Sequence, residues 1–174
     1  EEIGKALRRE VRMYPEVAIR ELVANAIIHQ DFTVTGAGPM VEIFDDRIEI
    51  TNPGRPLVDT MRFIDVPPRS RNETLAAFMR RLSICEERGS GIDKVIAEVE
   101  LYQLPAPEFA VIENNTRAVL FAHRRLSEMT RAERVRACYQ HACLCFVSNR
   151  QMTNATLRNR FAIVGKNAAQ ASRI

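Results

Sequence analysis

Three polar side chains spaced four residues apart carry the strongest chemical signal in the chain. Glu21, Asn25 and His29 recur along RELVANAIIH, where residues 22–28 are otherwise apolar. At about 100° per residue, a helix would place all three on one narrow stripe. A helix that is apolar almost all round is buried, and a buried carboxylate without a partner is costly or takes up a proton. The stripe must therefore line a polar cleft or pair internally.

The internal alternative is purely structural. Glu21 would pair with an arginine such as Arg20 or Arg55. Asn25 would then tie down a loop, and His29 would stabilise the end of its own helix.

The elements that must position this stripe follow from periodicity and turn residues. Residues 15–30 read as a helix that begins at Pro15. Alternating apolar residues on either side of Asp45-Asp46 predict a β-hairpin that ends at Asn52-Pro53-Gly54. We expect a loop over 55–70, a helix over 72–84 and a further helix that ends at about residue 101. Strands should follow over 109–112 and 118–122. The tail should form helices over 133–146, 154–162 and 168–174. Segregated helices and hairpins indicate an α+β fold.

Charge divides the chain into an acidic body and a basic tail. The net charge is +3, but residues 1–122 carry 15 Lys+Arg against 20 Asp+Glu, and residues 123–174 carry 10 against 2. The two parts therefore have charges of −5 and +8, which sum to +3. A basic tail suggests an anionic partner, most simply nucleic acid, although a solvated basic surface would look the same.

Four motifs, in order, resemble a known ATPase superfamily. Glu21-x-x-x-Asn25 on an apolar helix is similar to the N-box of the gyrase, heat-shock-90 and histidine-kinase ATPases. Asn52-Pro53-Gly54 stands where that superfamily has an Asp-x-Gly-x-Gly loop, and Arg88-Gly89-Ser90-Gly91 looks like its second glycine box. More closely, YPEVAIRELVANAIIHQDF, IEITNPGRP, RNETLAAFMRRL and ERGSGIDKV resemble the ATPase-like module of bacterial RecG-related transcriptional regulators, which usually carry a Schlafen-like AlbA domain. The resemblance covers about residues 12–122.

This resemblance implies a pocket for ATP and Mg²⁺. Glu21 would be the catalytic residue that orients or deprotonates water, and Asn25 would hold the metal. Glycines fit phosphate contacts, because backbone N–H groups must approach phosphates closely at a helix N-terminus. The full set of implied binding positions is Asn25, His29, Asp31, Asn52, Gly54, Gly89 and Gly91.

Asn52 has an amide where the superfamily has a carboxylate that accepts from the adenine amino group. We therefore expect a degenerate pocket that acts as a sensor or scaffold. An active Mg²⁺-dependent ATPase acting on DNA is the rival hypothesis, and a non-catalytic dimerisation module, which would make a homodimer, is the third.

The basic tail has the sequence form of a helix-turn-helix, with Thr153 as a helix cap and a glycine-containing turn at 164–167. It resembles the winged helix that often follows the module in the same family. We expect two domains, an ATPase-like α+β sandwich over 1–124 with helices on one face of a mixed or antiparallel sheet, and a partial winged helix over 127–174. Its third helix would enter the major groove and the arginines before it would meet phosphates. The candidate DNA contacts are Arg158, Arg160, Lys166, Asn167, Gln170 and Arg173.

Several other classes of function are disfavoured. No G-x-x-x-x-G-K-[ST] loop is present, so the residues do not support a helicase motor. The set Cys138, His141, Cys143 and Cys145 could bind a metal, but we favour an amphipathic helix that buries small side chains, because structural zinc usually draws its ligands from two separated pairs. The cysteine spacing and the absence of a secretory signal or long apolar run predict a cytoplasmic protein with no membrane partner.

Overall fold

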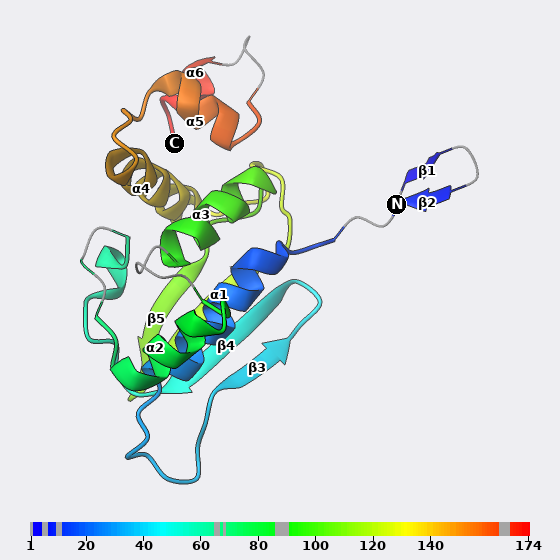
Figure 1. Ribbon diagram of the computed structural model, residues 1–174. Coiled ribbons are helices and arrows are strands. Elements are labelled where there is room, and N and C mark those ends of the chain that lie inside the picture. Colours follow the sequence, from blue (N-terminus) through cyan, green and yellow to red (C-terminus); the bar gives the residue numbers. More distant parts are fainter. Residues whose placement is uncertain are drawn as a thin grey trace.

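The computed structural model describes residues 2–4, 7–9, 12–64, 67, 69–85, 91–163 and 168–174. Its main feature is a four-stranded antiparallel sheet with the strand order β3-β4-β6-β5 (Figure 1). A separate antiparallel pair, β1 with β2, was not predicted from the sequence. The strands are β1 (Glu2–Gly4), β2 (Leu7–Arg9), β3 (Met40–Ile43), β4 (Arg47–Pro53), β5 (Glu108–Ile112) and β6 (Asn115–Phe121). The helices are α1 (Glu16–His29), η1 (Thr60–Arg62), α2 (Glu73–Arg81), α3 (Gly91–Leu101), α4 (Arg131–Val147), α5 (Asn154–Arg160) and α6 (Ala168–Ala171).

The hairpin predicted around Asp45-Asp46 is present and fixes the register of the sheet. Val41 lies opposite Ile50 in the β3–β4 pair. In the β4–β6 pair, Ile48 faces Leu120 and Asn52 faces Thr116. Because side chains alternate along a strand, the apolar pairs and the Asn52–Thr116 pair point to the same face of the sheet. Asn52 is thereby brought to the helix-covered side.

Helices α1 and α3 cover this face. The core unites apolar side chains of both helices with those of β4 and β6: Ala18, Leu22, Ala26, Ile48, Ile50, Val95, Val99, Leu104 and Leu120. Each is at most 5% exposed. The α+β class, the antiparallel sheet and helix 15–30 are thus confirmed, and burial of this much apolar surface is what holds the two layers together.

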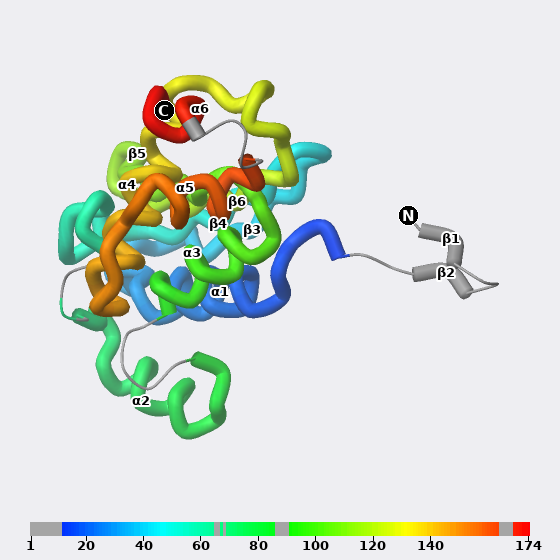
Figure 2. Tube along the Cα trace, turned by 90° about the horizontal axis from the view of Figure 1, so that it is seen from above, coloured from blue at the N-terminus to red at the C-terminus, as the bar shows by residue number. Residues whose placement is uncertain are grey.

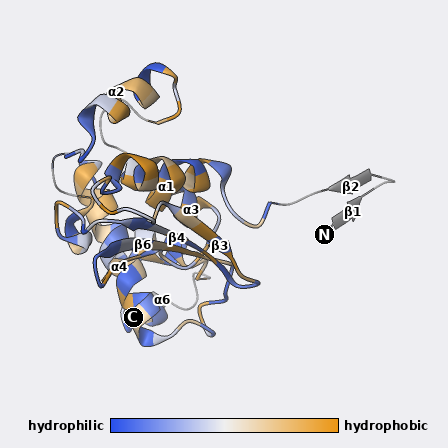
Figure 3. Cartoon of the chain, turned by 90° about the horizontal axis from the view of Figure 1, so that it is seen from below, coloured by the Kyte–Doolittle hydropathy of each residue, from blue (hydrophilic) through white to orange (hydrophobic). Residues whose placement is uncertain are grey.

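Helix α2 forms an outer layer on the side of α1 away from the sheet (Figures 2 and 3). Ala24 and Ile28 of α1 pack with Ala76 and Met79 of α2. Since α1 is contacted by the sheet on one side and by α2 on another, nearly every direction around it is buried. This double contact explains why its sequence is apolar almost all round.

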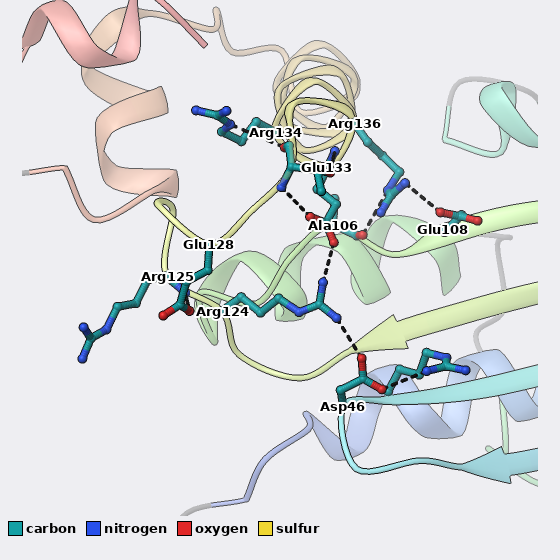
Figure 4. Close-up of polar contacts among 11 residues, drawn as sticks. Asp46, Ala106, Glu108, Arg124, Arg125, Glu128, Glu133, Arg134 and Arg136 are labelled. Atoms are coloured by element: carbon teal, nitrogen blue, oxygen red, sulfur yellow. Dashed lines mark hydrogen bonds and ion pairs between the residues drawn. The ribbon is translucent and has the colours of Figure 1, made fainter.

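The tail helices α4, α5 and α6 gather beside α3. Thr130 caps α4 in a capping box with Glu133, and the predicted cap Thr153 forms a second one on α5. Arg124 bridges Glu133 at 2.7 Å to Asp46 of the β3–β4 turn at 2.9 Å (Figure 4). The tail is therefore tied to the sheet by ion pairs as well as by apolar contacts.

The helix-turn-helix itself stays a proposal. Apolar side chains of α4, α5 and α6 share a small core, in which Ala137, Leu157, Phe161 and Ala171 are buried. The turn expected at 164–167 lies outside the described residues. The division into domains at 124 and 127 likewise remains a prediction.

Candidate functional site

A cavity of about 520 Å³ lies between α1, α2, α3 and the sheet. Small-molecule sites in proteins have volumes of this order and combine apolar walls with a few convergent polar groups. Leu22, Ile50, Ile92 and Phe109 supply apolar wall, and Phe63 packs edge-to-face on Phe109 with ring centroids 5.3 Å apart. Of the positions expected at a nucleotide site, the lining contains Glu21, Asn25, His29, Asn52 and Gly91.

Glu21, Asn25 and Gly91 converge on a single point of this cavity. A Cβ placed on Gly91 would lie 2.9 Å from Glu21 Oε2 and 3.6 Å from Asn25 Nδ2. The first helical residue of α3 therefore approaches the stripe of α1 more closely than a side chain would permit. A glycine here lets the backbone at the start of α3 lie against the Glu21 carboxylate, which a side chain would prevent.

Glu21 is held inside the protein. Its side chain is 2% exposed, and Oε1 accepts from Nη2 of Arg20 at 3.3 Å. The pairing that the structural alternative foresaw is thus present. It engages one carboxylate oxygen and leaves Oε2 directed towards Gly91.

No contact of Asn25 with a loop is seen among the described residues. Its Nδ2 atom is buried, and among the described residues it has no hydrogen-bond partner. Buried amides normally find partners, because an unsatisfied one costs about 1–3 kcal/mol. Rotation of the amide would present Oδ1 at the same place, where a cation would satisfy it.

Asn52 is oriented by the backbone of the residue that follows it. It is 5% exposed, and its Nδ2 donates to the carbonyl of Pro53 at 3.1 Å. Because the donor nitrogen is engaged, the acceptor oxygen Oδ1 remains for a ligand. A fixed amide oxygen can accept from an exocyclic amino group, as a carboxylate would.

His29 lines the cavity near the end of α1. Burial lowers the pKa of its imidazole below the ordinary value of 6.5, and the nearby cation of Arg71 lowers it further. His29 is therefore neutral at pH 7 and can act as a hydrogen-bond donor or acceptor rather than as a fixed cation.

Asp31 and Gly54 do not belong to the cavity lining. Gly54 has a φ of +102°, and a Cβ on it would lie 2.9 Å from Cβ of Asp31 and 3.3 Å from Cζ of Arg71. The Asp31 carboxylate accepts hydrogen bonds from Thr33 and Arg71. The side-chain and backbone donors of Thr33 do most to lower the pKa of Asp31. Both residues close the junction of α1, β4 and α2, so the expected phosphate contact of Gly54 does not fit its position.

Two adjacent residues missed in the sequence build this junction. Arg71 donates to the carbonyl of His29 at 3.1 Å, and Asn72 donates to the carbonyls of Ile28 and Gln30 at 2.8 and 2.9 Å. They satisfy the carbonyl groups that the end of α1 leaves open. Only their position immediately before the predicted second helix could have suggested this role. The cavity-lining cations Arg69 and Arg80 were missed as well.

The tail residues proposed for DNA differ in accessibility. Gln170 and Arg173 are exposed, and Arg158 is partly buried. Arg160 is 4% exposed and donates to the carbonyl of Leu104 at 2.8 Å, with Glu100 as its ion-pair partner. A phosphate contact by Arg160 therefore does not fit this structure. Gly89 of the second glycine box, and Lys166 and Asn167 of the tail, lie outside the described residues.

The cysteine and histidine set of α4 serves packing. His141 Nδ1 lies 2.9 Å from Glu100, and Cys145 is 2% exposed and 3.6 Å from His141 Nε2. Burial raises the pKa of the Cys145 thiol, which makes it less reactive. Within the described ranges, no group of three His, Cys, Asp or Glu side chains could hold a metal ion.

The fold and the site together define an α+β module with a cavity between its sheet and its helices. Residues 36–120 match the family model described as "Putative ATP-dependent DNA helicase recG C-terminal". The matched stretch contains the four strands of the main sheet with α2 and α3, and it begins after α1, which carries Glu21 and Asn25.

A solved structure shares this fold. The crystal structure of the DIP2311 protein from Corynebacterium diphtheriae aligns with a TM-score of 0.60 at 18% sequence identity, over 92% of this chain and 36% of that one. The chain thus spans about a third of that protein. A search of curated proteins gave no match. Across the part of the chain that the structure describes, no helix is long and apolar enough to cross a membrane.

Proposed function

We propose that the chain is a Mg²⁺-nucleotide-binding module of a DNA-associated regulator, and that it senses its ligand instead of driving a motor. The observation that carries this proposal is the convergence of Glu21 Oε2 and Asn25 Nδ2 on Gly91 at the wall of a 520 Å³ cavity. The match of residues 36–120 to the RecG C-terminal family model supports the same class of ligand.

The residues present fit the metal and the nucleotide. The buried Nδ2 atom of Asn25 has no partner within the described part of the chain, and Gly91 is a place where a Cβ would intrude. Mg²⁺ in nucleotide sites is typically held by one or two protein oxygens together with phosphate oxygens and water. Asn25 would supply the protein ligand, and the bound Mg²⁺ would neutralise phosphate charge.

The chain's own groups divide the remaining work. Asn52 offers an oriented acceptor at the sheet for an amino group of the base. Phe63 and Phe109 line the apolar part of the cavity, and neutral His29 offers a further hydrogen-bonding group. Glu21 is near enough to the Gly91 wall to position water, and the half-exposed Arg20 engages its other carboxylate oxygen.

Calorimetric titration with Mg-ATP tests this proposal. We expect saturable binding that Asn25→Ala weakens and that removal of Mg²⁺ weakens. Glu16→Gln is the matched control for Glu21→Gln, because Glu16 lies on the same helix, pairs with Arg12 and is outside the cavity lining. Phosphate release that Glu21→Gln abolishes and Glu16→Gln does not would favour the active ATPase. Absence of binding at millimolar nucleotide would refute the proposal and leave a dimerisation scaffold.

For DNA association the basic tail is the supporting observation. Residues 123–174 carry a net charge of +8. In the proposal Arg158 contacts phosphate, and Gln170 and Arg173 lie closer to the bases, as do Lys166 and Asn167. Phosphate contacts make log affinity fall with log salt concentration. If the chain does not bind duplex DNA at low salt, or binds it with an affinity that does not depend on salt, the proposal of DNA association is contradicted.

A further inference from the structure

The face of α2 that lines the cavity ends in an arginine. The lining includes Glu73, Ala76, Ala77 and Arg80, whose offsets of three, four and seven residues define one helical face. The two alanines leave room in front of this face. Arg80 therefore presents a cation to the cavity, whereas its neighbour Arg81 is exposed and outside the lining.

Two other cations near the cavity already have partners, and Arg69, which also lines it, is exposed. Arg20 pairs with Glu21, and Arg71 is bound to Asp31 and to backbone carbonyls. Among the described residues, no hydrogen bond or ion pair involves the guanidinium of Arg80, which is partly buried. A partly desolvated cation without an acceptor is unfavourable, and an anion in the cavity would remove that cost.

The direction of α2 brings Arg80 towards Asn25. Asn72, just before α2, binds carbonyls at the end of α1, and Ala24 of α1 clusters with Met79 of α2. Helix α2 therefore starts beside the end of α1 and runs back along it. Its last turn, with Arg80, therefore lies beside the part of α1 that carries Ala24, and Arg80 and Asn25 line the same cavity.

We propose that Arg80 binds the phosphate groups of the ligand that occupies this cavity. An oxygen-rich anion would give the Arg80 guanidinium an acceptor, and a guanidinium can bind two phosphate oxygens at once. Arg80 thus makes the phosphate contact for which Gly54 is badly placed. The inference rests on the proposed nucleotide function and adds the residue that selects for phosphate.

The test compares Arg80→Gln with Arg81→Gln in the full chain. Both changes remove one positive charge from the last turn of α2, so they alter net charge and helix electrostatics alike. Calorimetry with Mg-ATP, adenosine and inorganic tripolyphosphate separates recognition of the base from recognition of phosphate. We expect R80Q to weaken Mg-ATP binding by about 10- to 100-fold, as for the loss of a charged hydrogen bond, with adenosine binding unchanged. R81Q should bind all three ligands as the unmodified protein does.

Each outcome decides the inference. Mg-ATP affinity of R80Q equal to that of R81Q overturns it. If the unmodified chain binds neither Mg-ATP nor adenosine, the proposed function fails, and the binding of tripolyphosphate then decides the inference. Tripolyphosphate binding that R80Q loses and R81Q keeps supports Arg80 as an anion-binding residue. Equal tripolyphosphate affinity in R80Q and R81Q, or no binding by the unmodified chain, overturns the inference. If R80Q lowers the melting temperature relative to R81Q, Arg80→Lys carries the test, since it keeps the charge and loses the paired donors. Affinity of R80K equal to that of the unmodified protein then also overturns the inference.

Discussion

Replacement of Arg160 by methionine tests whether this arginine is an internal tether. Arg160 joins α5 to α3 through Glu100 and the Leu104 carbonyl, and it is 4% exposed. Methionine keeps much of the aliphatic stem, so the loss falls mainly on the polar contacts. Removal of one partner from a buried ion pair costs about 3–5 kcal/mol. Because His141 also contacts Glu100 at 2.9 Å, we expect the lower end, about 3 kcal/mol in the free energy of unfolding.

Urea unfolding at low and high salt measures this effect. Arg150→Met is the matched control, because Arg150 is exposed, and we expect it to change the free energy of unfolding by less than about 0.5 kcal/mol. The loss in Arg160→Met should be nearly independent of salt, since buried pairs are weakly screened. A loss below about 1 kcal/mol, or one that vanishes in high salt, would refute the tether and restore Arg160 as a surface residue available to phosphates.

Three further changes follow from local geometry. Gly54→Ala should lower the free energy of unfolding, measured in urea, by about 2–4 kcal/mol, because Gly54 has a positive φ and an added Cβ would meet Asp31. Gly36→Ala is the control, since Gly36 has a positive φ but open space around it and should lose only the stability that the backbone strain costs. Equal losses in the two variants would contradict the packing argument. Because the pKa of His29 is lowered in the folded protein, the unfolded state takes up the proton first as pH falls below 6.5, and stability falls. His29→Gln should therefore flatten the fall in the free energy of unfolding between pH 7.5 and pH 5.5. An unchanged dependence of that free energy on pH would show that His29 is not the group responsible. Ala162→Gly should raise the melting temperature, because Ala162 lies just after α5 with a φ of +50°, a conformation that glycine adopts without steric penalty. The gain in the free energy of unfolding should be at most about 1 kcal/mol. A lower melting temperature would show that the greater entropy of the unfolded glycine variant dominates.

Local chemistry allowed most elements to be predicted. The Asp45-Asp46 turn, the cap of α5, and the glycine and proline breaks act over a few residues, so the order of the main elements and the β3–β4 hairpin follow from the chain alone. The pair β1–β2 was missed because two three-residue strands carry almost no periodicity.

The candidate site was predicted in part for the same reason. The stripe of Glu21, Asn25 and His29 lies on one helix and was visible at 3.6-residue spacing. The arginines on the other wall were not, because Arg69 and Arg80 reach the cavity only when α2 folds back over α1. Gly54 shows the reverse error: its place in the motif suggested a phosphate contact, but packing against Asp31 and Arg71 decides its role.

The sequence by itself determined the α-helices, the hairpins of the main sheet, the buried stripe and the contrast between an acidic body and a basic tail, because those depend on near neighbours and on composition. Tertiary structure alone decided that Arg160 is buried against Glu100, that Asn25 Nδ2 is buried without a partner among the described residues, and that Arg80 lines the cavity. Burial and partnership are properties of residues distant in the chain, so no local pattern can encode which charge is paired and which is left for a ligand.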